Sequence, residues 1–219
     1  MPKNTPAATD AAELQKRLDS VNSKLRISEL LLSVSQKIAG LKNLSEILWT
    51  IIETTTETLN ADRGSLFLND PLTGELYSRV AQGELIRVMR ILNTNGIAGS
   101  IFQSGVGEII HDAYADDRFN SKIDEQTGYV TKNIVCAPVK TVRGDVIGVI
   151  QILNKKRGRF TKEDLDIVQG ITLQAAVSLQ NAQGMEEMVK SREKEMKFLD
   201  VVAEVTSEIE LGSLLQRVM

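Results

Sequence analysis

A short glycine-rich stretch offers the clearest opportunity for chemistry in this chain. Asn95 and Gly96 are followed by Ile97, Ala98 and Gly99, and a helical pattern starts at this point. The first turn of a helix presents backbone N–H groups without intrahelical partners and the positive end of the helix dipole, so it can bind an anion such as phosphate. Glycine-rich helix starts are also common without any ligand, and the pattern alone favours that structural role.

Nucleophilic or redox chemistry would depend on one cysteine and one histidine. Cys136 lies in the middle of an apolar run, which predicts a buried structural side chain rather than a reactive thiolate. His111 is the only histidine, and the local sequence suggests no third group to orient a Cys–His pair. No Cys and His residues have the spacing of a zinc site. A reductase that uses Cys136 is therefore only an alternative, and we expect no catalytic residue, cofactor or metal in this segment.

A polar segment from Asp112 to Lys132 interrupts the regular pattern of the chain. Its aromatic residues, Tyr114, Phe119 and Tyr129, are scattered, and the segment is too long for a simple turn. Long irregular segments in compact domains are often lids or binding loops. We call residues 112–132 the lid segment, and an ordinary surface excursion remains the alternative.

These candidate residues need a scaffold, and two apolar runs predict its centre. Residues 134–139 and 146–153 are apolar at nearly every position, which is typical of strands covered on both faces. The polar link Thr141–Asp145 contains Gly144 and suits a hairpin turn. The other strand candidates are residues 63–68, 75–80, 88–92 and 108–110.

Helices are expected on both sides of this sheet. An alternating four–three spacing predicts a coiled-coil seam in the first helix, at Leu14, Leu18, Val21, Leu25, Ser28, Leu32 and Ser35. An amphipathic helix packed on its own domain is the alternative. Ser45 and Thr161 are N-cap candidates for two further helices, the second of which runs towards Thr206. Its charged stretch 186–197 is typical of a helix that bridges domains or pairs with a copy of itself.

The end of the chain repeats a pattern from its beginning. The apolar positions of residues 198–218 match those of residues 31–51 at a constant offset, so we expect the opening helices of a second copy of one domain. The expected organisation is a disordered terminus at 1–12, an N-terminal dimerisation helix at 13–40, a domain at 28–183, a linker helix at 184–197 and a truncated second copy at 198–219.

Composition limits the class of protein. Hydrophobic residues make up 42% of the chain and charged residues 25%, as in an ordinary soluble globular protein. The formal net charge of −3 gives no support for a nucleic-acid partner. Since there is neither an apolar run of membrane-spanning length nor a leader at Met1, we expect a cytoplasmic protein without a membrane partner.

Residues 28–183 resemble the GAF domain family in their order of helix, strand hairpin, irregular loop, strong hairpin and long exit helix. The more specific resemblance is to the cyclic-nucleotide-binding GAF domains of phosphodiesterases and cyanobacterial adenylyl cyclases, which carry an Asn-Lys, Phe, Asp-Glu signature. Asn154, Lys155, Phe160 and Asp164 match that signature, and Leu165 replaces its final Glu. The resemblance implies an α+β fold, with an antiparallel sheet of about six strands covered by helices on both faces.

The resemblance also implies the residues of a ligand site. Ile97 and Ala98 would donate backbone N–H groups to a cyclic phosphate, and Ser65 would meet the base. The other implied lining residues are Phe119, Asp124, Thr127, Thr131 and Gln151. The residues implied to support this pocket from behind are Asn154, Lys155, Phe160 and Asp164.

The resemblance favours cAMP over cGMP as the ligand. Ala81 and Gln82 stand where cGMP binders often carry an aromatic residue and an acid, and the overall pattern is closer to the cyanobacterial cyclases. We expect a regulatory homodimer, paired through helices 13–38 and 165–197, in which the lid segment closes over the nucleotide. The exit helix would transmit the signal to a downstream effector such as an adenylyl cyclase. A ligand-free dimerisation and relay module of a sensor kinase or similar protein is the alternative.

Overall fold

The computed structural model describes residues 6–41, 43–83 and 89–218. Within these residues one antiparallel sheet has the strand order β3-β2-β1-β6-β5-β4. The strands are β1 (Ala61–Asp70), β2 (Glu75–Ala81), β3 (Arg90–Leu92), β4 (Glu108–Ile110), β5 (Ile134–Lys140) and β6 (Val146–Lys155). The helices are α1 (Pro6–Ile38), α2 (Leu44–Thr58), α3 (Gly96–Ser104), α4 (Ser121–Thr127) and α5 (Lys162–Val218).

The register of β1 against β6 gives the sheet two different faces. Residues paired across antiparallel strands point to the same face, and successive residues point to opposite faces. Leu66 pairs with Ile150 on one face, whereas Ser65 pairs with Gln151 on the other. A row of paired residues on this second face crosses four strands, at Ala81, Ser65, Gln151 and Cys136.

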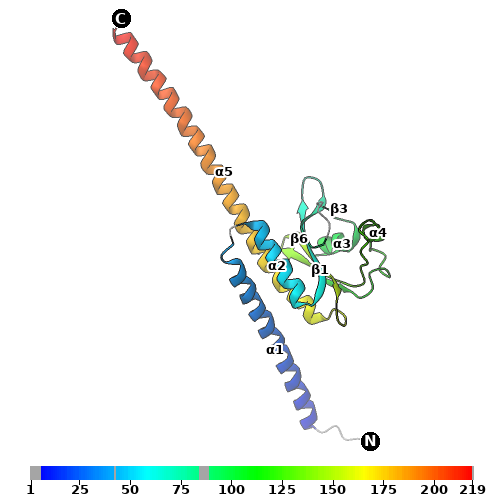
Figure 1. Ribbon diagram of the computed structural model, residues 1–219. Coiled ribbons are helices and arrows are strands. Elements are labelled where there is room, and N and C mark those ends of the chain that lie inside the picture. Colours follow the sequence, from blue (N-terminus) through cyan, green and yellow to red (C-terminus); the bar gives the residue numbers. More distant parts are fainter. Residues whose placement is uncertain (1–5, 42, 84–88, 219) are drawn as a thin grey trace. The chain divides into compact units, whose positions relative to one another are not determined.

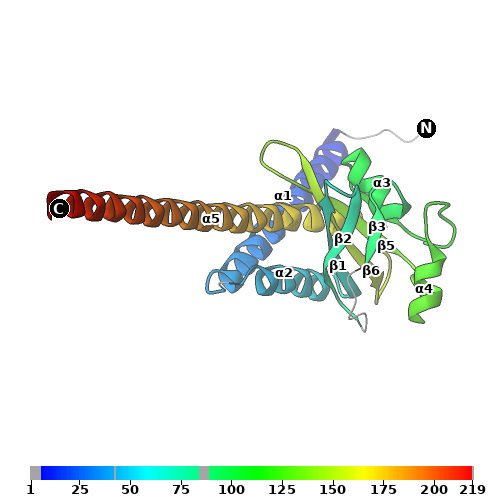
Figure 2. The ribbon, with the colours of Figure 1, turned by 90° about the horizontal axis from the view of Figure 1, so that it is seen from above.

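The first face of the sheet is covered by α2 and the first turns of α5, and α1 packs against these two helices (Figures 1 and 2). A Cβ added to Gly64 of β1 would lie 2.7 Å from Ile52 of α2, so the helix packs almost directly on the strand backbone. Ser35 of α1 donates a hydrogen bond to Gln174 of α5. The buried residues that these helices contribute include Val34, Leu48, Ile51, Ile52, Val168, Ile171 and Ala175.

The second face of the sheet carries α3, and α4 lies on the same side (Figure 1). A cluster of buried side chains joins α3 to the strands, and it comprises Phe67, Ile97, Ala98, Ile101, Ile134, Cys136 and Val149 among others. Apolar packing on both faces explains why β5 and β6 are apolar at almost every position, as the sequence predicts. The turn between them contains Gly144 at φ +93°, as a tight hairpin requires.

The chain divides into two compact units, Met1–Ser178 and Leu179–Met219. The second unit is helical to Val218, and its exposed side chains include Met188, Met196, Phe198 and Leu199. The repeat of the pattern of residues 31–51 predicts a break near residues 206–210, as between α1 and α2. The helix α5 instead continues unbroken through these residues. No described helix is both long and apolar enough to cross a membrane.

Local capping accounts for several differences from the predicted elements. Asn43, not Ser45, caps α2, because its side chain accepts a hydrogen bond from the Ser45 N–H. The lid segment contains α4, which Asn120 caps at its start and Gly128 ends in the left-handed conformation. The first helix begins at Pro6 rather than at residue 13. Val88, where a strand was expected to start, lies outside the described residues.

Replacing Gly148 with alanine should destabilise the sheet strongly. A Cβ at Gly148 would lie 2.2 Å from the carbonyl oxygen of Phe67, which is backbone of the neighbouring strand and cannot move aside alone. We expect the free energy of unfolding, measured by urea denaturation, to fall by about 1–3 kcal/mol or more. Gly40→Ala is the control, because nothing lies within 4 Å of its added Cβ. Equal effects of the two substitutions would contradict this packing.

Candidate functional site

A cavity of about 350 Å³ lies on the second face of the sheet. This volume falls within the range of roughly 300–1,000 Å³ that is typical of small-molecule sites. Its walls come from β1, β2, β3, β5, β6, α3 and the lid segment with α4. All the residues predicted to contact a ligand line it, namely Ser65, Ile97, Ala98, Phe119, Asp124, Thr127, Thr131 and Gln151.

The floor of the cavity combines one polar pair with apolar neighbours. Ser65 and Gln151 are paired across β1 and β6, and Ser65 is only 8% exposed. Neither side chain has a hydrogen-bond partner in the part of the chain that the structure describes. Leu153, two residues along β6, and Phe67, two residues along β1, line the cavity beside them. The floor can therefore offer hydrogen bonds to a ligand whose faces are apolar.

The start of α3 presents its first backbone amides to the cavity. Asn95 is the N-cap, with extended backbone, but its side chain makes no capping hydrogen bond. The N–H of Gly99 is bonded to the carbonyl of Asn95, so the preceding amides have no such partner in the helix. Two of these belong to Ile97 and Ala98, which line the cavity. This arrangement is suited to an anion.

Both glycines at this helix start are required by the backbone. Gly96 has φ +72°, a conformation that other residues adopt rarely. A Cβ on Gly99 would lie 2.9 Å from the carbonyl carbon of Thr94. The glycine pattern therefore has a structural cause, and its consequence is a helix start that lies close against the cavity wall.

Asp124 fastens the lid segment to itself. Its carboxylate accepts hydrogen bonds from the Thr131 N–H at 2.6 Å, from the Thr131 hydroxyl at 2.8 Å and from the Tyr114 hydroxyl at 2.9 Å. The bond from Tyr114 raises the pKa of that phenol. Asp124 and Thr131 line the cavity, but their polar groups bond to each other, so the Asp124 carboxylate holds the lid segment together.

Asn154 connects β6 to the end of the lid segment. Its side-chain oxygen accepts a hydrogen bond from the Lys132 N–H at 2.6 Å, and its amide nitrogen donates to the Val130 carbonyl at 2.7 Å and the Tyr129 hydroxyl at 2.9 Å. Asn154 has φ +55°, which asparagine tolerates better than most residues. It lies outside the cavity lining.

The other residues of the signature connect β6 to α5. Lys155 forms an ion pair with Asp164, and its Nζ lies 5.7 Å from the ring centroid of the buried Phe160. Asp164 also accepts a hydrogen bond from the Thr161 N–H, and the Thr161 hydroxyl accepts one from the Asp164 N–H. This reciprocal arrangement caps α5 as predicted. Like Asn154, these three residues of the predicted signature lie outside the cavity lining.

Arg63 and Tyr129 form a part of the wall that the sequence analysis did not assign. The Arg63 guanidinium stacks over the Tyr129 ring at 4.0 Å, and both residues line the cavity. Burial and a hydrogen bond to Asp62 raise the pKa of Tyr129. Arg63 lies two residues before Ser65 on the same strand, so strand periodicity would have placed both on one face.

Comparison with known proteins identifies the family. Residues 43–179 match the GAF domain family. This chain belongs to the GAF domain family. The six-stranded antiparallel sheet with its helices is the GAF fold, and this segment is a regulatory domain rather than a catalytic one.

The relatives of this GAF domain include cyclic-nucleotide phosphodiesterases. The chain is 31% identical over 198 residues to a probable 3′,5′-cyclic phosphodiesterase of Caenorhabditis elegans. It is 34% identical over 197 residues to a dual 3′,5′-cyclic-AMP and -GMP phosphodiesterase of Drosophila melanogaster, and 30% over 200 residues to a cGMP-specific one. The alignments cover 84%, 82% and 82% of this chain but 27%, 14% and 18% of those proteins, so it spans less than a third of their length.

Solved structures share the GAF fold at low identity. The GAF domain of a phosphoenolpyruvate-protein phosphotransferase from Coxiella burnetii has a TM-score of 0.68 at 19% identity, covering 74% of this chain and 98% of that one. A free methionine-R-sulfoxide reductase from Neisseria meningitidis, in complex with its substrate, has a TM-score of 0.62 at 16% identity, covering 73% and 91%. At such identities the likeness concerns the fold alone.

Cys136 does not provide reductase chemistry in this GAF domain. Its side chain is fully buried beneath α3, and burial raises the pKa of the thiol far above its usual range. The thiolate, which is the reactive form, is therefore suppressed. Among the residues that are described, no three His, Cys, Asp or Glu side chains are grouped so that they could hold a metal ion.

Replacing Asp124 with asparagine should loosen the lid segment of this GAF domain. Both oxygens of the Asp124 carboxylate accept hydrogen bonds, and in asparagine an N–H₂ group that cannot accept replaces one of these oxygens. At least one donor then loses its partner, so we expect the free energy of unfolding to fall by about 1–3 kcal/mol. The pKa of Tyr114 should also fall towards its usual value, which an absorbance titration measures. Asp117→Asn is the control, because it also removes one carboxylate from the lid segment, at an exposed position that does not contribute to the raised pKa of Tyr114. An unshifted Tyr114 titration in Asp124→Asn would rule out this role of the carboxylate.

Proposed function

We propose that this GAF domain binds a cyclic nucleotide in the cavity and prefers cGMP to cAMP. The observation that carries the proposal is that one cavity holds both unpartnered helix amides and an unpartnered polar pair in an apolar floor. The amides of Ile97 and Ala98 suit the cyclic phosphate, and Ser65 and Gln151 suit the edge of a base.

The charge of the cavity wall supports an anionic ligand. Asp124 is an acid in the lining, but its carboxylate is already surrounded by three donors from the protein. Arg63 adds a cation that has no ion-pair partner in the described part of the chain. Its guanidinium keeps its N–H donors in a fixed plane over Tyr129, where a phosphate or base oxygen can accept from them.

We propose cGMP in place of cAMP, which the resemblance of the sequence favours. A hydroxyl and an amide each donate and accept hydrogen bonds, so Ser65 and Gln151 can pair with either purine. The relatives supply the preference: one is named as specific for cGMP and another as acting on both cyclic nucleotides. They give no support to a preference for cAMP or to an adenylyl cyclase as the effector.

A path for the signal leads from the lid segment to α5. Asn154 holds the end of the lid segment, and the next residue, Lys155, is paired with Asp164 in the first turn of α5. A ligand that changes the position of the lid segment would therefore act on the base of the exit helix. We propose that α5 passes this change to an effector, and that residues 198–219 open a second GAF domain.

We also propose that the protein is a homodimer paired through helices 13–38 and 165–197. The predicted seam of α1 is uncovered, with Leu14, Leu18, Val21, Leu25 and Leu32 each more than half exposed. Leu173 of α5 is 54% exposed. Uncovered apolar residues at heptad spacing are the pattern of a coiled-coil seam. The same surface supports the second candidate function, a ligand-free dimerisation and relay module.

Calorimetry with purified protein tests the binding proposal. We expect cGMP to bind more tightly than cAMP, and guanosine, which lacks the phosphate, to bind more weakly than cGMP. Ser65→Ala removes one hydrogen bond to the base and should weaken cGMP binding by about threefold to tenfold. Ser104→Ala, outside the cavity, should leave it unchanged. Absence of heat with both cyclic nucleotides at millimolar concentration would reject the proposal.

Sedimentation velocity tests the dimer. The double variant Leu18→Glu, Leu25→Glu places two charges in the seam and should convert a dimer to a monomer, because burying unpaired charges is costly. The matched control is Lys16→Ala, Lys24→Ala, which lowers the net charge by the same two units at exposed positions of the same helix outside the seam. A monomeric wild-type protein would be evidence against both the dimer and the relay module.

A further inference from the structure

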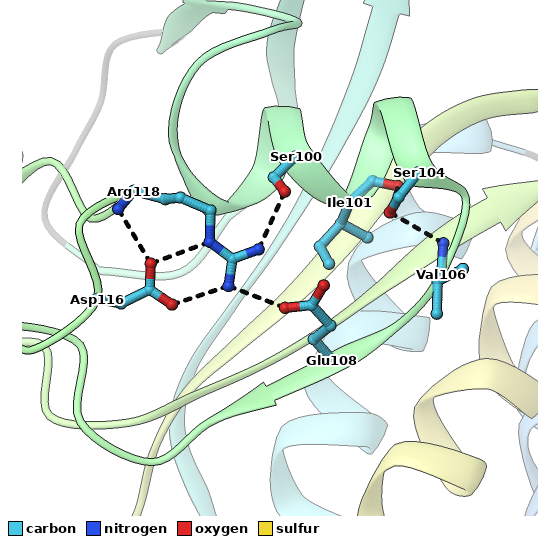
Figure 3. A network of polar contacts seen from close by, with 7 residues as sticks. All are labelled: Ser100, Ile101, Ser104, Val106, Glu108, Asp116 and Arg118. Atoms are coloured by element: carbon cyan, nitrogen blue, oxygen red, sulfur yellow. Dashed lines mark hydrogen bonds and ion pairs between the residues drawn. The ribbon is translucent and has the colours of Figure 1, made fainter.

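The guanidinium of Arg118 joins three separate segments beside the cavity (Figure 3). Its Nε and Nη2 donate to the Asp116 carboxylate in the lid segment at 2.9 and 2.8 Å. Nη2 also donates to Glu108 of β4 at 2.8 Å, and Nη1 donates to the Ser100 hydroxyl of α3 at 3.0 Å. A planar guanidinium has its donors at fixed angles, so these contacts fix the three segments relative to one another.

The residues next to these contacts line the cavity, although Arg118 itself does not. Phe119 and Asn120 follow Arg118 directly in the chain, and both belong to the lining. Ser100 lies one helical turn after Gly96 and Ile97, which present the helix start to the cavity. The carbonyl oxygen of Arg118 also approaches Gly96, 3.8 Å from the position of an added Cβ. The Arg118 side chain thus contacts both α3, close to its start, and the adjoining part of the lid segment.

The contacts of Arg118 fix the relative positions of the segments more than they add to the stability of the fold. The Arg118 side chain is 35% exposed and that of Glu108 is 39% exposed, so solvent screens their charges and limits the contribution to stability. Asp116 is less exposed, and its hydrogen bond to Arg118 lowers the pKa of its carboxyl. The Asp116 carboxylate therefore stays ionised in neutral solution, and its two hydrogen bonds keep the Arg118 guanidinium in one orientation.

We propose that Arg118 is a positioning residue for the ligand. It holds the first turn of α3 and residues 119–120 in the arrangement that the cyclic nucleotide requires, without touching the nucleotide. This role rests on the proposed function, because the ligand is the one proposed above. The hydrogen bond from Arg118 to the Ser100 hydroxyl is the contact through which Arg118 acts on the helix start at the phosphate end of the cavity.

Two measurements on four variants test the role. Hydrogen exchange followed by mass spectrometry reports the mobility of residues 96–104 and 112–127 in the ligand-free protein, and calorimetry reports the affinity for cGMP. The variants are Ser100→Ala, Arg118→Ala, Arg118→Lys and the double variant Ser100→Ala, Arg118→Ala. Ser104→Ala is the matched control, because Ser104 lies on the same helix and its hydroxyl bonds only locally, with Ile101 and Val106 (Figure 3).

We expect Arg118→Ala to speed exchange in both segments and to weaken cGMP binding by about tenfold or more, since it removes several charge-assisted hydrogen bonds. Ser100→Ala should speed exchange in 96–104 and weaken binding by about threefold to tenfold. The double variant should bind no more weakly than Arg118→Ala, because both changes break the same contact. Arg118→Lys keeps the charge but lacks the fork, so it should not restore the affinity.

The outcomes separate this proposal from the proposed function. Unchanged exchange in Arg118→Ala overturns the positioning role whether or not a nucleotide binds. Faster exchange with an unchanged affinity for cGMP also overturns it, as does full rescue by lysine or an equal effect of Ser104→Ala. If the wild-type protein binds neither nucleotide, the proposed function fails, and the exchange data alone decide whether Arg118 holds the two segments.

Discussion

The pairing of β1 with β6 is the constraint on which the rest of the structure depends. Side chains alternate along a strand, so a slip of one residue would exchange the two faces of the sheet. In the observed register Leu66 and Ile150 lie against the helices while Ser65 and Gln151 lie in the cavity floor. Gly64 enforces this register, because only a residue without a side chain leaves room for Ile52 and Thr56 of α2. The helical layer on one face therefore determines which residues a ligand meets on the other.

The segments around the cavity satisfy many of their polar groups with one another. Asp124 binds Thr131 and Tyr114, Asn154 binds the backbone at Lys132, and Arg118 binds Ser100. A long polar segment held in this way loses little additional conformational freedom when a ligand arrives, which lowers the entropic cost of binding. Ser65, Gln151 and the first amides of α3 have no hydrogen-bond partner within the described residues, and they lie at the cavity.

Sequence patterns predict the scaffold well because local rules decide it. Uninterrupted apolar runs indicate the two central strands, and Gly144 indicates the turn between them. Ile97 and Ala98 follow from the glycine-rich helix start as well as from the resemblance, and the other lining residues follow from the resemblance alone. The structure places all of them around one cavity without testing whether they bind. The helix α4 was missed because seven residues are too few for apolar periodicity to be recognised. The contacts of Arg118 were missed because Ser100 and Glu108 are distant in sequence, and only the pair Asp116–Arg118 is local.

Cys136 lies on the cavity face of the sheet but outside the cavity lining. The row Ala81, Ser65, Gln151 and Cys136 crosses the sheet on the cavity face, so the thiol is on the same face as the candidate ligand site. It is nevertheless sealed, since Ile97, Ala98 and Ile101 of α3 pack over it. The helix that offers its first amides to the cavity is thus also the element that keeps the thiol protonated and out of reach. This placement of α3 leaves Ala81, Ser65 and Gln151 as the members of the row that line the cavity, whereas the thiol lies outside the lining.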